Sequence, residues 1–156
     1  MPGERASLKL SLLNGGVETT KQVADVIRST SPTIVLVERD RYVCDLVMLF
    51  LKRVGFEVEI AESGYIGLAR VRHLERAIVI TEILVPALDG LALCRQIKGD
   101  PALRVGVIVL SMLSAAERAN QAGADAFLLK PIDEERLINT VKDIAAKLSA
   151  EGSPSP

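Results

Sequence analysis

The chain has 156 residues, the length of one ordinary domain, and it carries 19 basic side chains against 20 acidic ones. This balance disfavours a nucleic-acid binder and a polybasic membrane anchor. The longest apolar run, 46–51, is too short to cross a bilayer, and no signal-peptide pattern opens the chain. We therefore expect a cytoplasmic protein that contacts neither membrane nor nucleic acid through this chain. Two distant cysteines and a single histidine form no disulfide or zinc pattern.

The two ends of the chain differ from its middle. Thr19 and Gln22 have capping-box spacing, and apolar residues then recur at helical intervals, which predicts a short helix over 18–29. Residues 150–156 are small, polar and proline-rich, as in a disordered tail or a linker. We therefore divide the chain into an N-terminal extension (1–31), a domain (32–149) and a tail (150–156).

Between these ends, β-branched runs alternate with amphipathic segments. The runs predict strands at 33–37, 56–60, 77–81, 105–110 and 125–129. The segments between and after them predict helices at 41–53, 64–75, 90–98, 114–122 and 133–148. This strict alternation is typical of an α/β fold with right-handed crossovers, a doubly wound five-stranded parallel sheet.

Polar side chains gather where the predicted strands end. In an open parallel sheet, ligands bind beyond the carboxyl ends of the strands, so these residues form the candidate site. The residues at these ends are Glu38, Arg39, Glu82, Ser111 and Lys130, with Pro131 next to the lysine. Asp40 also follows the first strand, and we expect it to cap helix 41–53 rather than to bind a ligand.

Four segments of the sequence carry a family resemblance. They are Ile34–Asp40, an apolar run ending in charged residues; Glu82–Gly90, which contains Pro86 and Asp89-Gly90; Ser111-Met112; and Gly123–Pro131, with Phe127 ahead of Lys130-Pro131. In this order and spacing, the chain resembles the receiver domain of bacterial two-component response regulators. The resemblance implies a flavodoxin-like (βα)5 fold and a role in phosphorelay signal transduction. It places Ser111, Phe127 and Lys130 at the family's hydroxyl, switch aromatic and lysine.

Two positions depart from the pattern of that family. Its members phosphorylate an aspartate and use two further acids to hold Mg²⁺, but here Glu82 stands at the phosphoacceptor position and Arg39 at the second acidic position. The charges of Glu38, Arg39, Glu82 and Lys130 sum to zero, and an arginine repels a divalent cation. We therefore expect an atypical receiver, or pseudo-receiver. It would have no catalytic residue, metal or cofactor, and would signal by protein contact without Mg²⁺-dependent aspartyl phosphorylation.

Four other interpretations stay open at this point. Arg39 and Glu82 could form a salt bridge in a degenerate pocket that no longer switches. Glu82 could instead reach Ser111 and Lys130 and partly mimic the phosphorylated state. Arg39 and Lys130 could bind a small anionic or nucleotide ligand. The chain could also be a conventional phosphorelay receiver that is still modified weakly.

Residues 114–148 are the candidate surface for a protein partner or a homodimer. The resemblance assigns to this segment the face that changes when receivers switch. Its first helix is rich in alanine and therefore lightly anchored, and its exposed positions carry both signs of charge, which suits symmetric pairing. The predicted helix 18–29 is the rival surface, because its apolar residues must also be buried somewhere.

Overall fold

The computed structural model describes residues 20, 22 and 31–151. The chain divides into two units, 1–31 and 32–156. The helix expected over 18–29 lies outside the described residues except at positions 20 and 22, which are both helical. In the described part of the chain, no helix is both long enough and apolar enough to span a bilayer.

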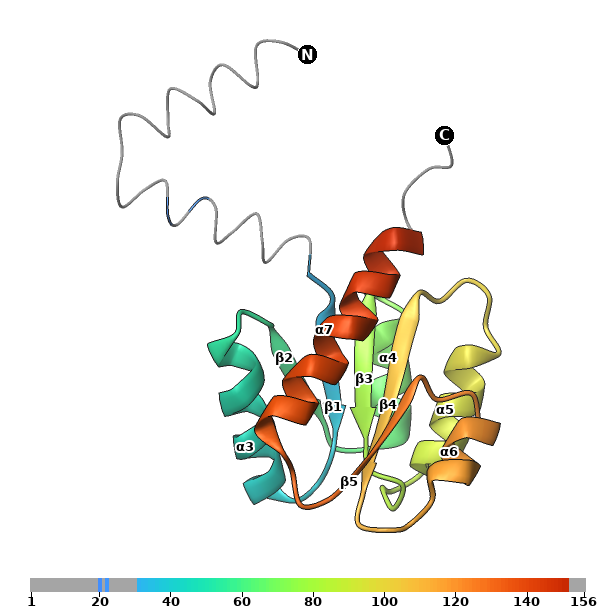
Figure 1. The fold of residues 1–156 in the computed structure, drawn as a ribbon. Helices are drawn as coiled ribbons and strands as arrows, with labels where there is room; N and C mark the ends of the chain where they lie inside the picture. The colour runs from blue at the N-terminus through green and yellow to red at the C-terminus, as the bar shows by residue number, and fades with distance from the viewer. Residues whose placement is uncertain (1–19, 21, 23–30, 152–156) are drawn as a thin grey trace. The chain divides into compact units, whose positions relative to one another are not determined.

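Five strands and five helices alternate along the larger unit (Figure 1). The strands are β1 (Thr33–Val37), β2 (Val58–Ala61), β3 (Ala77–Thr81), β4 (Val105–Ser111) and β5 (Ala126–Leu129). The helices are α3 (Arg41–Arg53), α4 (Gly64–Val71), α5 (Gly90–Lys98), α6 (Ala116–Gln121) and α7 (Glu134–Glu151). All strand pairs are parallel, in the order β2-β1-β3-β4-β5. This arrangement confirms the predicted doubly wound five-stranded sheet.

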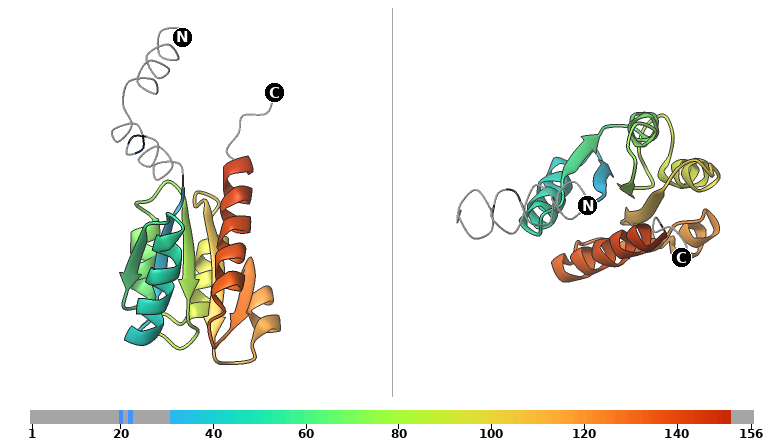
Figure 2. Two further views of the ribbon diagram at one scale, coloured as in Figure 1. Left: turned by 60° about the vertical axis from the view of Figure 1, so that its left-hand side comes forward. Right: turned by 90° about the horizontal axis from the view of Figure 1, so that it is seen from above.

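Helices cover both faces of the sheet, and successive strand residues point to opposite faces. Ile34 and Leu36 of β1 belong to the apolar cluster beneath α3 and α7, whereas Val35 and Val37 belong to the cluster beneath α4, α5 and α6. Figure 2 shows the two layers from above, with α3 and α7 on one side and α4 and α5 on the other. Burial on both faces explains why the strands are continuous apolar runs.

The structure corrects the ends of two predicted elements near the start of the domain. Strand β2 covers 58–61 instead of 56–60, because Phe56 still donates its amide to the end of α3, at the Leu51 carbonyl. Helix α4 ends at Val71 instead of residue 75. The amides of His73 and Leu74 bond to carbonyls only three residues back, and such tightening closes a helix.

Four further elements differ from their predicted ends in the second half of the domain. Helix α6 begins at Ala116 instead of 114, since a turn links the Ala115 amide to the Leu113 carbonyl. Strand β5 begins one residue late and β4 extends to Ser111. Helix α7 covers 134–151, so residues 150–151 are helical and do not belong to a tail. Arg104 bonds to the Leu148 carbonyl, and Leu148 itself is buried, which holds this last part of α7.

Carboxylate caps fix the loops at the carboxyl edge of the sheet. The Asp40 carboxylate accepts the amides of Tyr42 and Val43 at 2.9 and 3.4 Å, so Asp40 is the N-cap of α3 as predicted. Asp89 caps α5 in the same way, accepting two amides at 2.9 Å. These caps hold the loops that follow β1 and β3, where Glu38, Arg39 and Glu82 of the candidate site lie.

Candidate functional site

Four strand ends bring the core of the candidate site together. Glu38 follows β1, Glu82 follows β3, Ser111 ends β4 and Lys130 follows β5. The ammonium of Lys130 lies 2.8 Å from Glu38 Oε2 and 2.9 Å from Glu82 Oε2. The side chains of Lys130, Glu38 and Glu82 are only 11%, 6% and 11% exposed. We call this buried group of two carboxylates and one ammonium the Glu38–Lys130–Glu82 cluster.

Backbone amides and a hydroxyl complete the bonding of the two carboxylates. Glu38 Oε1 accepts the amides of Arg39 and Asp40, both at 3.0 Å. Glu82 Oε1 accepts the amide of Ile83 at 2.6 Å, and the Ser111 side chain also bonds to Glu82. Every oxygen of both carboxylates therefore has a donor within the protein.

Glu82 and Lys130 keep their charged forms. Burial by itself raises the pKa of Glu82, but hydrogen bonds from Ser111, Lys130 and the Ile83 amide outweigh it and hold that pKa below the ordinary value. Burial by itself lowers the pKa of Lys130, but the hydrogen bonds to Glu38 and Glu82 outweigh the effect of burial. The pKa of Lys130 is therefore raised above its ordinary value. Glu82 is thus ionised at neutral pH and held by an ammonium that stays protonated.

Arg39 does not join the cluster. Its side chain is exposed and makes no hydrogen bond or ion pair among the described residues, so the interpretation in which Arg39 forms a salt bridge with Glu82 is wrong. The cause is the alternation of an extended chain: Glu38 points inward from the end of β1, and the next residue points away. The neutral four-charge pocket expected from the sequence is therefore replaced by a cluster of two carboxylates and one lysine.

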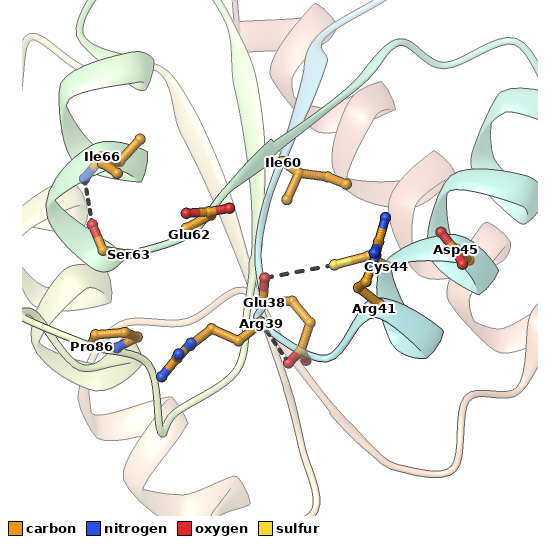
Figure 3. Close-up of a pocket in the computed structure, with 10 residues that line it drawn as sticks. All are labelled: Glu38, Arg39, Arg41, Cys44, Asp45, Ile60, Glu62, Ser63, Ile66 and Pro86. Atoms are coloured by element: carbon orange, nitrogen blue, oxygen red, sulfur yellow. Dashed lines mark hydrogen bonds between the residues drawn. The ribbon is translucent and has the colours of Figure 1, made fainter.

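The two cations proposed as a joint ligand site line different pockets. Arg39 lines a pocket of about 680 Å³ beside α3 and α4, shown in Figure 3. Lys130 lines one of about 460 Å³ between α3 and the loop after β5, where Asp40, Met112 and Pro131 also lie. The two pockets therefore give no support to the interpretation in which Arg39 and Lys130 bind one small anionic or nucleotide ligand.

The residues present do not fit a Mg²⁺ site of the kind that the family uses. Magnesium prefers oxygen ligands in near-octahedral geometry. The oxygens of Glu38 and Glu82 are engaged by the protein, Asp40 caps α3, and Arg39 supplies no oxygen. No group of three or more metal-ligating side chains occurs within the part of the chain that the structure describes.

The remaining predicted residues, Phe127 and Pro131, are not part of the Glu38–Lys130–Glu82 cluster. Phe127 is half-buried on β5 and packs against the apolar cluster beneath α4, α5 and α6. Pro131 follows Lys130 and is exposed. The Ile83 amide, which donates to Glu82, was not predicted, because a backbone group leaves no signal in the residue types.

Comparison with known proteins assigns the family. Residues 34–142 match the response regulator receiver domain. The transcriptional regulatory protein ZraR of Salmonella typhimurium is 30% identical over 125 residues, which cover 79% of this chain and 28% of that protein. This chain thus spans little more than a quarter of that relative's length.

Solved structures agree with this assignment. The signal receiver domain of a histidine kinase from Syntrophus aciditrophicus is 28% identical with a TM-score of 0.69, over 81% of this chain and 97% of that one. A CheY-like response regulator receiver domain protein from Methanospirillum hungatei is 26% identical with a TM-score of 0.69, over 78% and 99%.

The chain belongs to the response regulator receiver domain family and has its flavodoxin-like fold. It is a receiver domain of signal transduction, a kind of module that generally interacts with proteins such as kinases and effectors rather than acting as an enzyme.

Proposed function

We propose that this domain is a pseudo-receiver, which signals by protein contact without Mg²⁺-dependent phosphorylation. The observation that carries the proposal is the full engagement of Glu38 and Glu82, whose oxygens all accept bonds from within the protein. Phosphoryl transfer requires a metal ion to neutralise the developing charge and a free carboxylate oxygen to attack. Here the cluster offers neither an open set of metal ligands nor an unbonded acceptor oxygen.

The contacts of Glu82 support a further part of the proposal: this carboxylate partly takes the place of a phosphoryl group. The extra methylene of glutamate carries it to Lys130 at 2.9 Å and to the Ser111 hydroxyl. The family resemblance assigns those two residues to the switch. Because a carboxylate carries one negative charge and a phosphoryl group up to two, the mimicry is partial. The module would then stay near one signalling state.

The partner surface in this proposal is 114–148, through which the domain binds a protein or a second copy of itself. Within α6 only Ala119 is buried, so this short helix is weakly anchored and can shift. Arg118 and Arg136 are both exposed and available to acidic groups of a partner. The same proposal includes a cytoplasmic site of action and no enzymatic activity. It also includes no contact of this chain with nucleic acid or membrane.

Calorimetric titration with Mg²⁺ and Mn²⁺ tests the proposal. We expect no saturable heat at millimolar metal from the natural chain. The matched variant combines Arg39→Asp with Glu82→Asp, which adds an acid after Glu38 and shortens the side chain that now reaches Lys130. We expect this variant to gain metal binding. Saturable binding to the natural chain would show a conventional receiver instead.

A further inference from the structure

The pocket that Arg39 lines lies where an open parallel sheet can receive a ligand. In the order β2-β1-β3-β4-β5, β2 is added on one side of β1 and the later strands on the other, so the strand order reverses between β1 and β3. Crevices at such a switch point are the usual ligand sites. Arg39 follows β1, while Pro86 of the loop after β3 lines the same pocket. In Figure 3, Arg39 extends toward Pro86. The volume of about 680 Å³ lies within the range of roughly 300–1,000 Å³ that small-molecule sites occupy.

Two arginines in this pocket have no hydrogen-bond or ion-pair partner for their side chains in the part of the chain that the structure describes. Arg39 and Arg41 both line it, both are exposed, and neither side chain makes a hydrogen bond or ion pair within the described residues. Lys130, by contrast, is occupied by two carboxylates. Guanidinium groups form paired, charge-assisted hydrogen bonds to phosphate oxygens. Arg39 and Arg41 therefore favour a ligand that carries a phosphate group.

The other walls indicate what else the ligand carries. Ile60 and Ile66 line the pocket and are 45% and 53% exposed, so an apolar ring placed against them would remove their surface from water. Asp45 and Glu62 also line it, and among the described residues their carboxylates form no ion pair. A simple polyanion would be repelled by these acids, whereas a ligand with hydroxyl or amino donors would bond to them.

We propose that this pocket binds a nucleoside phosphate. Its phosphates contact Arg39 and Arg41, its base lies against Ile60 and Ile66, and its sugar hydroxyls or base amino groups donate to Asp45 or Glu62. No metal ion takes part. This site is independent of the pseudo-receiver proposal. Glu38 of the cluster also lines the pocket, but both of its carboxylate oxygens are already bonded within the protein, and the ligand contacts use other side chains.

Isothermal titration calorimetry of the full chain, in buffer without divalent cations, tests the inference. The probes are ADP, GDP, CDP and UDP, with inorganic pyrophosphate as the anion that lacks a nucleoside. We expect at least one nucleotide to bind saturably and more tightly than pyrophosphate. The double variant Arg39→Gln, Arg41→Gln should weaken that binding by at least about tenfold, since it removes both charge-assisted contacts. Arg72→Gln, an exposed arginine outside the pocket, should leave it within about twofold of the natural chain.

A second variant separates the nucleoside from its phosphates. Ile66→Ser should weaken nucleotide binding several-fold and leave the heat of pyrophosphate binding unchanged. Failure of all four nucleotides to bind at millimolar concentration overturns the inference, and so does binding that survives the double arginine change. Equal affinity for pyrophosphate and nucleotide, unaffected by Ile66→Ser, overturns the nucleoside assignment and shows a simple anion site. Thermal unfolding of each variant shows that it remains folded.

Discussion

At the scale of single residues, Lys130 bonds to two carboxylates that have almost no contact with water. Glu38 and Glu82 are 6% and 11% exposed, and the same ammonium bonds to both. Removing one partner of such a buried group leaves the remaining charges uncompensated. The stability of this edge of the sheet therefore depends on Lys130.

Replacing this lysine tests that dependence. We expect Lys130→Met to lower the free energy of unfolding at neutral pH by about 3 kcal/mol. Lys142→Met, a change at an exposed lysine of α7, should have an effect of less than about 0.5 kcal/mol. Urea denaturation of both variants measures the difference. Equal small losses would mean that the cluster contributes little.

The pH dependence of stability should change sign in the same variant. In the natural chain the pKa of Glu82 is lowered by folding, so its contribution is present above its ordinary pKa of 4.5 and is lost as pH falls through the folded-state value. In Lys130→Met, burial remains but the ammonium is gone, and the pKa of Glu82 should rise. The stability deficit of the variant should therefore shrink as pH falls from neutral toward 4.5. Unfolding curves at several pH values measure it, and a constant deficit would contradict the account.

Double-mutant cycles distinguish the two cations. Arg39→Ala and Glu82→Ala should be additive within about 0.5 kcal/mol, because Arg39 does not contact Glu82. Lys130→Met and Glu82→Ala should show a coupling of more than about 1 kcal/mol, because these side chains lie 2.9 Å apart. Coupling of Arg39 to Glu82 would restore the salt bridge that the structure excludes.

The sequence predicted which residues meet, but not every bond between them. Glu38, Glu82, Ser111 and Lys130 were predicted to converge because parallel strands end at one edge of a sheet. The position of Arg39 was predicted wrongly, although alternation along the extended chain gave a signal that it points away from Glu38. The partners of Lys130 depend on the conformation of a long side chain, which residue types alone do not determine.

At the scale of helices and strands, the caps and both ends of α3 and α5 were predictable, but the C-terminal ends of α4 and α7 were not. Asp40 caps its helix as expected, and Ser63 and Asp89 cap theirs in the same way, since a carboxylate or hydroxyl before an apolar repeat has one favourable role. The end of α4 depends on amide bonds three residues back, and the extent of α7 depends on packing of Leu148 and a bond from Arg104. Neither the tightened last turn of α4 nor the tertiary contacts of α7 leave a recognisable pattern in the residue types.

The cap at Asp40 gives the prediction for this scale. Asp40→Ala should lower the free energy of unfolding by about 1 kcal/mol. Asp40→Ser should retain most of that stability, because a serine hydroxyl also accepts the amides of the first turn. Thermal unfolding compares the three chains. If serine is no better than alanine, the carboxylate contributes something other than a cap.

At the scale of the whole molecule, the surface over 114–148 is where association is expected. Reversing the charges with Arg118→Glu and Arg136→Glu should abolish self-association measured by sedimentation velocity. Removing residues 1–31 should leave self-association intact. If only the truncation abolishes it, the N-terminal extension is the interface and the proposed surface is wrong.

The measurement that tests the central claim most directly is the intact mass of the chain after incubation with acetyl phosphate and Mg²⁺. We predict no added phosphoryl group on the natural chain, and none on Glu82→Asp alone, since Arg39 still leaves the metal site without its second acid. The double variant Arg39→Asp, Glu82→Asp should gain one phosphoryl group and so serves as the positive control. Rapid addition of a phosphoryl group to the natural chain would contradict the account and show a working phosphorelay receiver.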